Sequence, residues 1–163
     1  MTSRRTAAAG SVLFLGAAPG VVAGVVPWWL TGWEAAPVPA GVRAAGAALA
    51  VAGAGVLLHA FGRFVVEGLG TPAPVAPTER LVVGGLYRHV RNPMYLAVEA
   101  VVVGQALLLG RPLLFAYAAV LGAVFAAFVR GYEEPALRDR YGADYEEYRR
   151  SVPGWLPRLG ARR

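Results

Sequence analysis

Four long blocks of apolar residues, separated by shorter polar segments, dominate the pattern along the chain. The blocks cover residues 11–30, 42–61, 94–109 and 112–129. An α-helix rises about 1.5 Å per residue, so about 20 apolar residues cross the hydrocarbon core of a bilayer. The pattern therefore predicts an all-α, multi-pass membrane helical bundle with about four transmembrane helices, forming one domain over residues 1–163.

The polar segment after the fourth block predicts an amphipathic helical tail. Apolar and aromatic residues recur there at steps of 4, 4, 3 and 4, which marks one face of a helix. That face consists of Leu137, Tyr141, Tyr145, Tyr148 and Val152. Its tyrosines either pack onto the membrane domain or line a pocket. Gly142 is expected to divide the tail into two short helices and Pro153 to end it, while Arg138 and Glu146 are expected on a solvated face.

Small and polar residues inside the blocks give further expectations. Gly16, Gly20 and Gly24 are spaced four apart, which favours close helix packing in lipid, and we expect the second block to pack against the first. The short turn at 110–112 predicts that the last two blocks form a helical hairpin. Glu99 lies about one turn inside the third block, where an acidic side chain is a functional candidate. It is close enough to the cytoplasmic end to snorkel or to pair with a nearby arginine, so we expect a structural role.

Composition narrows the class of protein, and the distribution of charge predicts its orientation in the membrane. Hydrophobic residues make up 56% of the chain and charged residues 16%, against about 25% charged residues in soluble domains. This excludes a disordered chain, a nucleic-acid-binding tail and an ordinary soluble enzyme. All 16 basic residues are arginine. Fourteen of them lie in the amino terminus, the middle segment and the tail, so the positive-inside rule places both termini in the cytoplasm.

The first block could be a cleaved signal peptide or a retained span. Trp28, Trp29 and Trp33 follow it closely, as in the aromatic belt at a membrane surface. The apolar stretch is also long for the hydrophobic region of a signal peptide. We therefore expect the block to be retained as a membrane anchor.

The candidate chemistry lies in two cytoplasmic segments, 68–95 and 130–158. The chain has no cysteine, which excludes disulfides and thiol nucleophiles, and its two histidines are 30 residues apart, so we expect no metal site. In the first segment, Pro93 occupies a first helical position and Asn92 is expected to be its N-cap. The free N–H groups of this helix start and the guanidinium of Arg91 predict an anion site. The alternative is a capped helix whose arginines contact lipid headgroups.

The second segment begins with two adjacent carboxylates, Glu133 and Glu134, directly after the fourth apolar block. Acidic side chains at the end of a lipid-embedded helix are costly unless they have partners. Adjacent positions on a helix point in different directions, so we expect the two carboxylates to have different partners.

Taken together, the two segments resemble one known family. The stretch 85–95, a helical hairpin, and then 133–137 with the tyrosines and prolines of the tail are similar to the isoprenylcysteine carboxyl methyltransferase and phospholipid methyltransferase superfamily. The resemblance covers residues 68 to 158 and implies a multi-pass membrane enzyme that uses S-adenosylmethionine and releases S-adenosylhomocysteine. The first motif of the family has a histidine where this chain has Asn92, which removes an ionisable group from the cofactor site.

The resemblance also implies the residues of the site. Those assigned to the cofactor are Tyr87, His89, Arg91, Asn92, Pro93, Tyr95, Glu133 and Glu134, although His89 is not in the matching histidine position. Those assigned to catalysis are Glu134 and Arg149. Those assigned to the acceptor are Tyr145, Tyr148 and Arg149. Arg91 suits the carboxylate of the cofactor, and Glu133 or Glu134 suits its ammonium or its ribose diol.

These features predict an S-adenosylmethionine-dependent methyltransferase in a bacterial inner membrane. The acceptor is expected to be a lipid-like or small amphiphilic molecule with a carboxylate, amine, thiol or phenol. The alternatives are an NADPH-dependent membrane reductase of the sterol-reductase type and a non-catalytic membrane scaffold. No nucleic-acid partner is expected, and the sequence leaves the oligomeric state open.

Overall fold

A computed structural model describes residues 17–63, 66 and 80–158, and over these residues the chain is helical with no β-strand. The first part of the first apolar block, with Gly16, lies outside the described residues. So do residues 68–79 of the predicted cofactor segment. The all-α prediction is confirmed for the part of the chain that is described.

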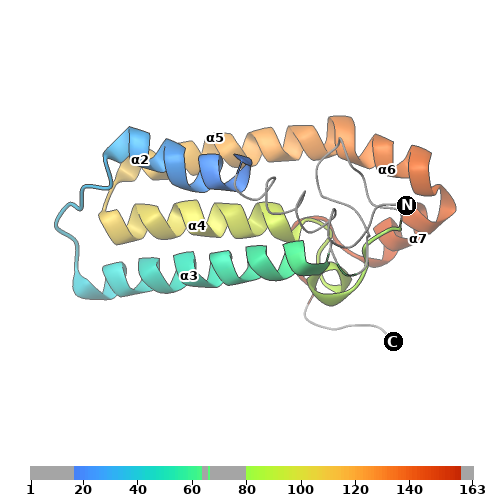
Figure 1. Cartoon of the computed structure of the whole chain (residues 1–163), viewed down its shortest axis with the longest axis horizontal. Coiled ribbons are helices and arrows are strands. Elements are labelled where there is room, and N and C mark those ends of the chain that lie inside the picture. Colours follow the sequence, from blue (N-terminus) through green and yellow to red (C-terminus); the bar gives the residue numbers. More distant parts are fainter. Residues whose placement is uncertain (1–16, 64–65, 67–79, 159–163) are drawn as a thin grey trace.

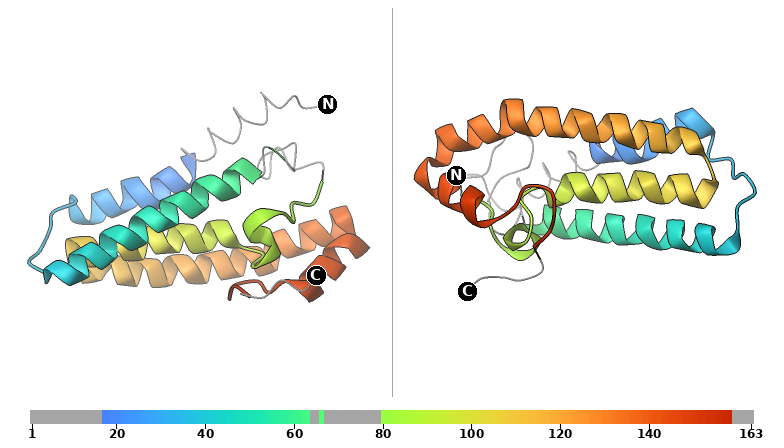
Figure 2. Two further views of the ribbon diagram at one scale, coloured as in Figure 1. Left: turned by 90° about the horizontal axis from the view of Figure 1, so that it is seen from below. Right: turned by 180° about the vertical axis from the view of Figure 1, so that it is seen from behind.

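The helices run up and down beside one another (Figures 1 and 2). In chain order they are η1 Val21–Val25, α2 Val26–Thr31, α3 Ala40–Arg63, η3 Gly85–Arg88, α4 Pro93–Leu109, α5 Pro112–Phe128, η4 Val129–Glu133, α6 Glu134–Tyr141 and α7 Ala143–Ser151. The connections α2–α3 and α4–α5 lie at one end of the bundle, and η3, α6 and α7 lie at the other (Figure 1). This arrangement brings the described parts of both predicted chemical segments to the same end.

Two of the helices are long and apolar enough to cross a membrane by length and composition. They are Ala40–Arg63, with a mean hydropathy of 1.8, and the continuous helix Pro112–Tyr141, with a mean hydropathy of 2.2. The described part of the first block and α4 form shorter apolar helices. The predicted bounds of the last three blocks agree with α3, α4 and α5, whereas the number of membrane crossings stays a prediction.

Within the described residues, the second apolar block packs chiefly against the third, whereas the sequence predicted packing against the first. α3 and α4 approach so closely that a Cβ on Gly46 would lie 2.4 Å from the backbone nitrogen of Leu108. A Cβ on Gly104 of α4 would lie 2.6 Å from the backbone nitrogen of Ala50. Among the described residues beyond its own helical turn, none has an atom within 4 Å of a Cβ built on Gly24. Close approach through small residues therefore occurs between α3 and α4 rather than at this glycine of the first block.

The predicted hairpin between α4 and α5 is confirmed. Gly110 adopts a left-handed conformation with φ 62°, and its N–H donates to the carbonyl of Ala106 to close α4. Pro112 then begins α5, where its missing N–H has no cost. Leu114, Ala118 and other buried apolar residues of α5 pack on the opposite face of α4 from α3 and complete the core.

Polar side chains from α4 and α5 hold the π-helical turn η1 of the first block. The hydroxyl of Tyr117 donates to the carbonyl of Val22 at 2.7 Å, and the amide of Gln105 donates to the carbonyl of Ala23 at 2.6 Å. A π-helical turn interrupts the regular i to i−4 ladder, and side chains of neighbouring helices satisfy the freed carbonyls. These bonds fix the first block against the hairpin.

Candidate functional site

The start of α4 and the junction of η4 with α6 meet at one end of the bundle. Arg91, two residues before α4, places its Nη1 2.8 Å from Oε1 of Glu134, the first residue of α6. The two side chains are only 14% and 13% exposed. An arginine–carboxylate pair with so little exposure is poorly screened by solvent, so it ties the two elements together more firmly than a surface pair would.

Arg91 also binds the segment that follows α7. Its Nε donates to the carbonyl of Val152 at 3.0 Å, its Nη1 to the hydroxyl of Tyr145 at 3.0 Å, and its backbone N–H to the carbonyl of Pro153 at 2.9 Å. One guanidinium therefore joins α4, α6, α7 and the segment beyond α7. Arg91 lies where the sequence placed an anion site, and in the structure the anion is the chain's own carboxylate.

The second carboxylate has a different partner, as expected for adjacent residues. Glu133 ends the π-helical turn η4 and accepts a hydrogen bond from the hydroxyl of Tyr95. The ring of Tyr95 packs against Phe125 with a centroid distance of 4.5 Å and lies 6.3 Å from the ring of Trp155. A π-helical turn shifts the register of the residues after it. This turn ends at Glu133, and Glu133 and Glu134 contact two different residues of the α4 region.

The tyrosines of the tail pack onto the bundle. Tyr145 is 2% exposed, and burial together with the nearby carboxylate of Glu134 raises its pKa. The hydroxyl of Tyr148 donates to the carbonyl of Tyr87 at 2.7 Å, and burial raises the pKa of both phenols. All three phenols therefore stay neutral at physiological pH, and those of Tyr145 and Tyr148 act as hydrogen-bonding groups rather than as bases.

Three of the predicted cofactor residues, His89, Asn92 and Pro93, lie at or just before the start of α4. Pro93 takes the first helical position as predicted, and Asn92 precedes it. The side chain of Asn92 does not cap the helix, which corrects that expectation, because its amide donates instead to the carbonyl of Gly154 at 3.0 Å. The Nδ1 atom of His89 lies 3.0 Å from the carbonyl oxygen of Arg158. The structure therefore places His89 on the segment after α7 rather than in the Arg91–Glu134 cluster.

Two more arginines surround Glu134. Arg149 lies 3.6 Å from its Oε2 atom and Arg138 lies 3.7 Å from the same atom. Arg138 also donates to Glu146 at 2.6 Å, and the two side chains stay 38% and 41% exposed, as expected of a solvated face. The spacing of Glu134 and Arg138, four residues apart on a helix, was the signal that could have revealed this pair. No pattern in the sequence pointed to Trp155.

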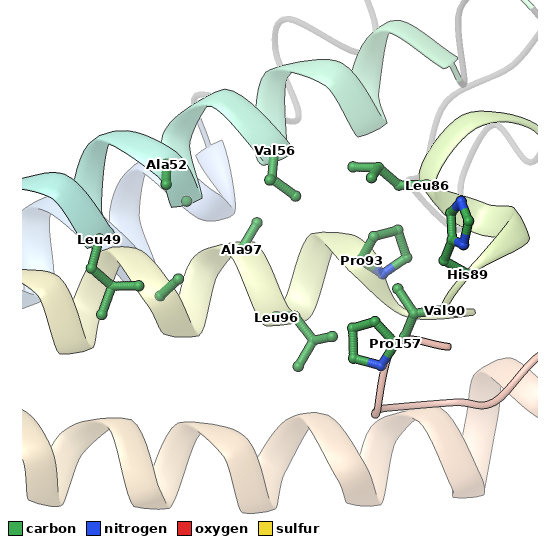
Figure 3. Close-up of a pocket in the computed structure, with 12 residues that line it drawn as sticks. Leu49, Ala52, Val56, Leu86, His89, Val90, Pro93, Leu96, Ala97 and Pro157 are labelled. Atoms are coloured by element: carbon green, nitrogen blue, oxygen red, sulfur yellow. The ribbon is translucent and has the colours of Figure 1, made fainter. Parts of the chain in front are cut away.

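An apolar cavity lies on another side of α4. It is a groove of about 410 Å³ between α3 and α4, and its lining is almost wholly apolar (Figure 3). Ala97 and Ala100 of α4 and Val56 of α3 form its walls, with His89 and Pro157 at one end. Its size is typical of ligand sites, and its lining suits a hydrocarbon chain. Arg91 and Glu134, in contrast, contact each other directly.

Comparisons with known proteins identify a family. The model of a family described as phospholipid methyltransferase matches residues 42–144, which is more than half of the 163 residues. The matched range contains Arg91, Tyr95, Glu133 and Glu134, and it ends just before Tyr145. No curated protein matches, and no solved structure matches.

Proposed function

The chain belongs to the phospholipid methyltransferase family, and we propose that it is an S-adenosylmethionine-dependent membrane methyltransferase whose acceptor is lipid-like. The observation that carries the proposal is the convergence of Arg91 with Glu134, and of Tyr95 with Glu133, at one end of the apolar bundle. These four residues come from two segments about 40 residues apart in sequence, and the helical hairpin brings them together. Family membership supports methyl transfer, and the position of the site supports an acceptor drawn from lipid.

The donor set of the described residues fits S-adenosylmethionine, a molecule that carries a carboxylate, an ammonium, a ribose diol, an adenine and a sulfonium. Glu133 keeps acceptor capacity beyond its bond from Tyr95 and suits the ammonium or the diol. Arg91 suits the carboxylate. Trp155 and Tyr95 provide aromatic surface beside these groups and suit the adenine. When bound, the cofactor supplies an electrophilic methyl group.

The chain's own contribution to such a reaction is positioning. Methyl transfer proceeds in line, so most of the acceleration comes from holding the nucleophile close to the methyl carbon and excluding water. We assign Arg91, Tyr95 and Glu133 to cofactor contacts. Glu134 is paired with Arg91, Arg138 and Arg149. We therefore assign Glu134, together with Arg149, to positioning Arg91. The catalytic roles that the resemblance implies for Glu134 and Arg149 stay predictions. Two tyrosines of α7 hold the same region in place: Tyr145 accepts a hydrogen bond from Arg91, and Tyr148 donates one to the carbonyl of Tyr87.

The membrane location follows from the same features. The family and the two long apolar helices support association with a membrane. We propose that α3, α4, α5 and the first block all cross it, with η3, α6 and α7 on the cytoplasmic side. The arginine distribution supports this orientation. The water-soluble cofactor then reaches the site from the cytoplasm and the acceptor reaches it from the lipid phase.

Ligand-dependent thermal stabilisation of the purified protein in detergent tests this proposal. We expect S-adenosylhomocysteine to raise the melting temperature and NADPH to leave it unchanged, since a ligand that binds only the folded state stabilises it. Stabilisation by NADPH alone would favour the membrane reductase. Cofactor binding without turnover on any lipid extract would favour the scaffold.

A matched pair of variants tests whether cofactor binding depends on a carboxylate of the proposed site rather than on one at the surface. Glu133→Gln keeps the size of the side chain and removes its charge, and we expect it to weaken S-adenosylhomocysteine binding at least tenfold in calorimetry. Glu147→Gln makes the same change at an exposed position on α7 and should leave binding unchanged. Equal binding by both variants and the wild type would contradict the assigned site.

A further inference from the structure

The apolar groove between α3 and α4 takes no part in the proposed cofactor site. Its wall on α3 is formed by residues spaced three and four apart, which lie on one face of the helix: Leu49, Ala52, Gly53 and Val56. From the first to the last of these residues, α3 rises about 10 Å, which fits within one leaflet of a hydrocarbon core about 30 Å thick. The groove is therefore long enough to hold much of one acyl chain.

The face of α3 that lines the groove becomes basic at the end beside η3. His59 and Arg63 follow Val56 by three and seven residues, so they continue the same face. Nε2 of His59 lies 2.9 Å, and Nε of Arg63 lies 3.0 Å, from the position that a Cβ on Gly85 would occupy. Gly85 has φ 58°, a conformation that favours glycine, so this space stays open. The next residue, Leu86, lines the groove itself.

The groove and its basic end together match the two parts of an anionic phospholipid. None of the described residues that line the groove is acidic, and His89 is the polar residue among them (Figure 3). The guanidinium of Arg63 presents a fork of N–H donors that suits a phosphate. Basic pockets between transmembrane helices on the cytoplasmic side bind the headgroups of anionic lipids. The apolar walls suit the acyl chain, and the basic side chains suit the phosphate.

The groove is separate from the residues assigned to the proposed reaction. Tyr95 and Glu99 lie on a different face of α4, where they contact Phe125 and the space beside Gly122 of α5. Oε1 of Glu99 has no hydrogen-bond partner among the described residues, so the arginine pairing considered from the sequence is not seen at that atom. A lipid in the α3–α4 groove is therefore held away from the Tyr95–Glu133 pair.

We propose that the α3–α4 groove binds an anionic phospholipid that is not a methyl acceptor, with an acyl chain along the apolar walls and the phosphate at His59 and Arg63. In the proposed orientation this lipid belongs to the cytoplasmic leaflet. Its chain also packs on Pro157, which lines the groove next to His89. The N–H of Arg158 donates to the carbonyl of His89 at 3.0 Å, so the lipid lies against the segment that ties the tail to α4. The site requires neither cofactor nor methyl transfer.

Native mass spectrometry of the full chain in detergent tests the headgroup preference. Phosphatidylglycerol is anionic, whereas phosphatidylcholine with the same acyl chains carries a compensating cation. We expect the wild type to bind phosphatidylglycerol about fivefold more tightly. The double variant His59→Gln, Arg63→Gln should lose this preference, and Arg150→Gln, at an exposed position of α7, should keep it. A wild type without the preference, or a double variant that retains it, would overturn the inference.

A second pair of variants tests the acyl-chain part and covers the case in which the double variant does not fold. Ala52→Leu fills the groove from an exposed position of α3, and Ala54→Leu makes the same change on the opposite face of that helix. We expect Ala52→Leu to weaken the binding of both lipids about threefold and Ala54→Leu to leave it unchanged. Equal lipid binding by the two variants would contradict a chain in the groove.

Two further measurements on the same preparations separate this inference from the proposed function. Glu133→Gln should bind phosphatidylglycerol like the wild type, because Glu133 pairs with Tyr95 on a different face of α4. Loss of phosphatidylglycerol binding in Glu133→Gln would place the lipid at the cofactor site and overturn the inference. A wild type that binds phosphatidylglycerol but not S-adenosylhomocysteine would support the lipid site and overturn the proposed function alone.

Discussion

The guanidinium of Arg91 lies 2.8 Å from the carboxylate of Glu134, although the two residues are 43 positions apart in sequence. The α4–α5 hairpin brings the chain back to the end of the bundle at which α4 begins, and this makes the contact possible. The same guanidinium holds the carbonyl of Val152 and the hydroxyl of Tyr145. Arg91 is therefore the residue through which the apolar bundle and the tail are joined.

Removal of the Arg91 side chain should destabilise the protein strongly. Arg91→Ala leaves the shielded carboxylate of Glu134 without its closest partner, and breaking such a pair costs about 3 kcal/mol. Unfolding in mixed micelles measures the change in the free energy of unfolding. Arg88→Ala removes an exposed arginine nearby and should change that free energy by less than about 0.5 kcal/mol. Equal effects of the two variants would contradict the assigned network.

The α3–α4 contact predicts opposite outcomes for two glycines of one helix. In Gly46→Ala, the new methyl group meets the backbone of Leu108 at 2.4 Å, and overpacking of this kind costs about 2 kcal/mol. In Gly55→Ala, the methyl group meets no atom of another described segment within 4 Å, so stability should be unchanged or slightly raised by helix propensity. Thermal unfolding of both variants in one detergent checks this. A destabilised Gly55→Ala with an unaffected Gly46→Ala would refute the packing.

The ion pair between α6 and α7 predicts a specific pH dependence. The hydrogen bond from Arg138 lowers the pKa of Glu146 below its ordinary value of 4.5. A carboxyl group with a lowered pKa in the folded state contributes stability above its unfolded pKa and loses it as the pH falls through the folded pKa. The wild type should therefore melt at a higher temperature than Glu146→Gln at pH 7. The difference should shrink as the pH falls below 4.5 and vanish once Glu146 is protonated in the folded state as well. A difference independent of pH would contradict the pair.

The absence of cysteine allows the orientation to be tested with single introduced thiols. Glu34 is 80% exposed near the α2–α3 connection, and Arg88 is exposed at the opposite end, in η3. In intact cells, a membrane-impermeant maleimide should label Glu34→Cys directly. It should label Arg88→Cys only after the membrane is permeabilised. The reverse pattern would invert the proposed topology.

The sequence predicted the helices well because each has a strong local signal. Proline marks the starts of α4 and α5, glycine marks the end of α4 and the break between α6 and α7, and long apolar runs fill the spans. Helix pairing was harder to predict, since small residues such as Gly46 permit close approach without specifying the partner helix.

The sequence also identified which segments converge, but it did not identify the partners of individual side chains. Arg91 and Glu134 were placed in one site, yet Asn92 was expected to cap a helix and instead holds the backbone of Gly154. Its partner lies 62 residues away and carries no side chain, so no sequence pattern could indicate it. The π-helical turn that ends at Glu133 has no sequence signature either.

The most direct test of the proposed function is methyl transfer from S-adenosylmethionine labelled in its methyl group. Membranes that contain the protein are incubated with the labelled donor, and the lipid extract is examined by mass spectrometry. We predict labelled lipid that depends on the wild-type chain, is lost in Glu133→Gln and persists in Glu147→Gln. An unlabelled lipid extract from wild-type membranes, together with no binding of S-adenosylhomocysteine by the purified protein, would contradict the assignment.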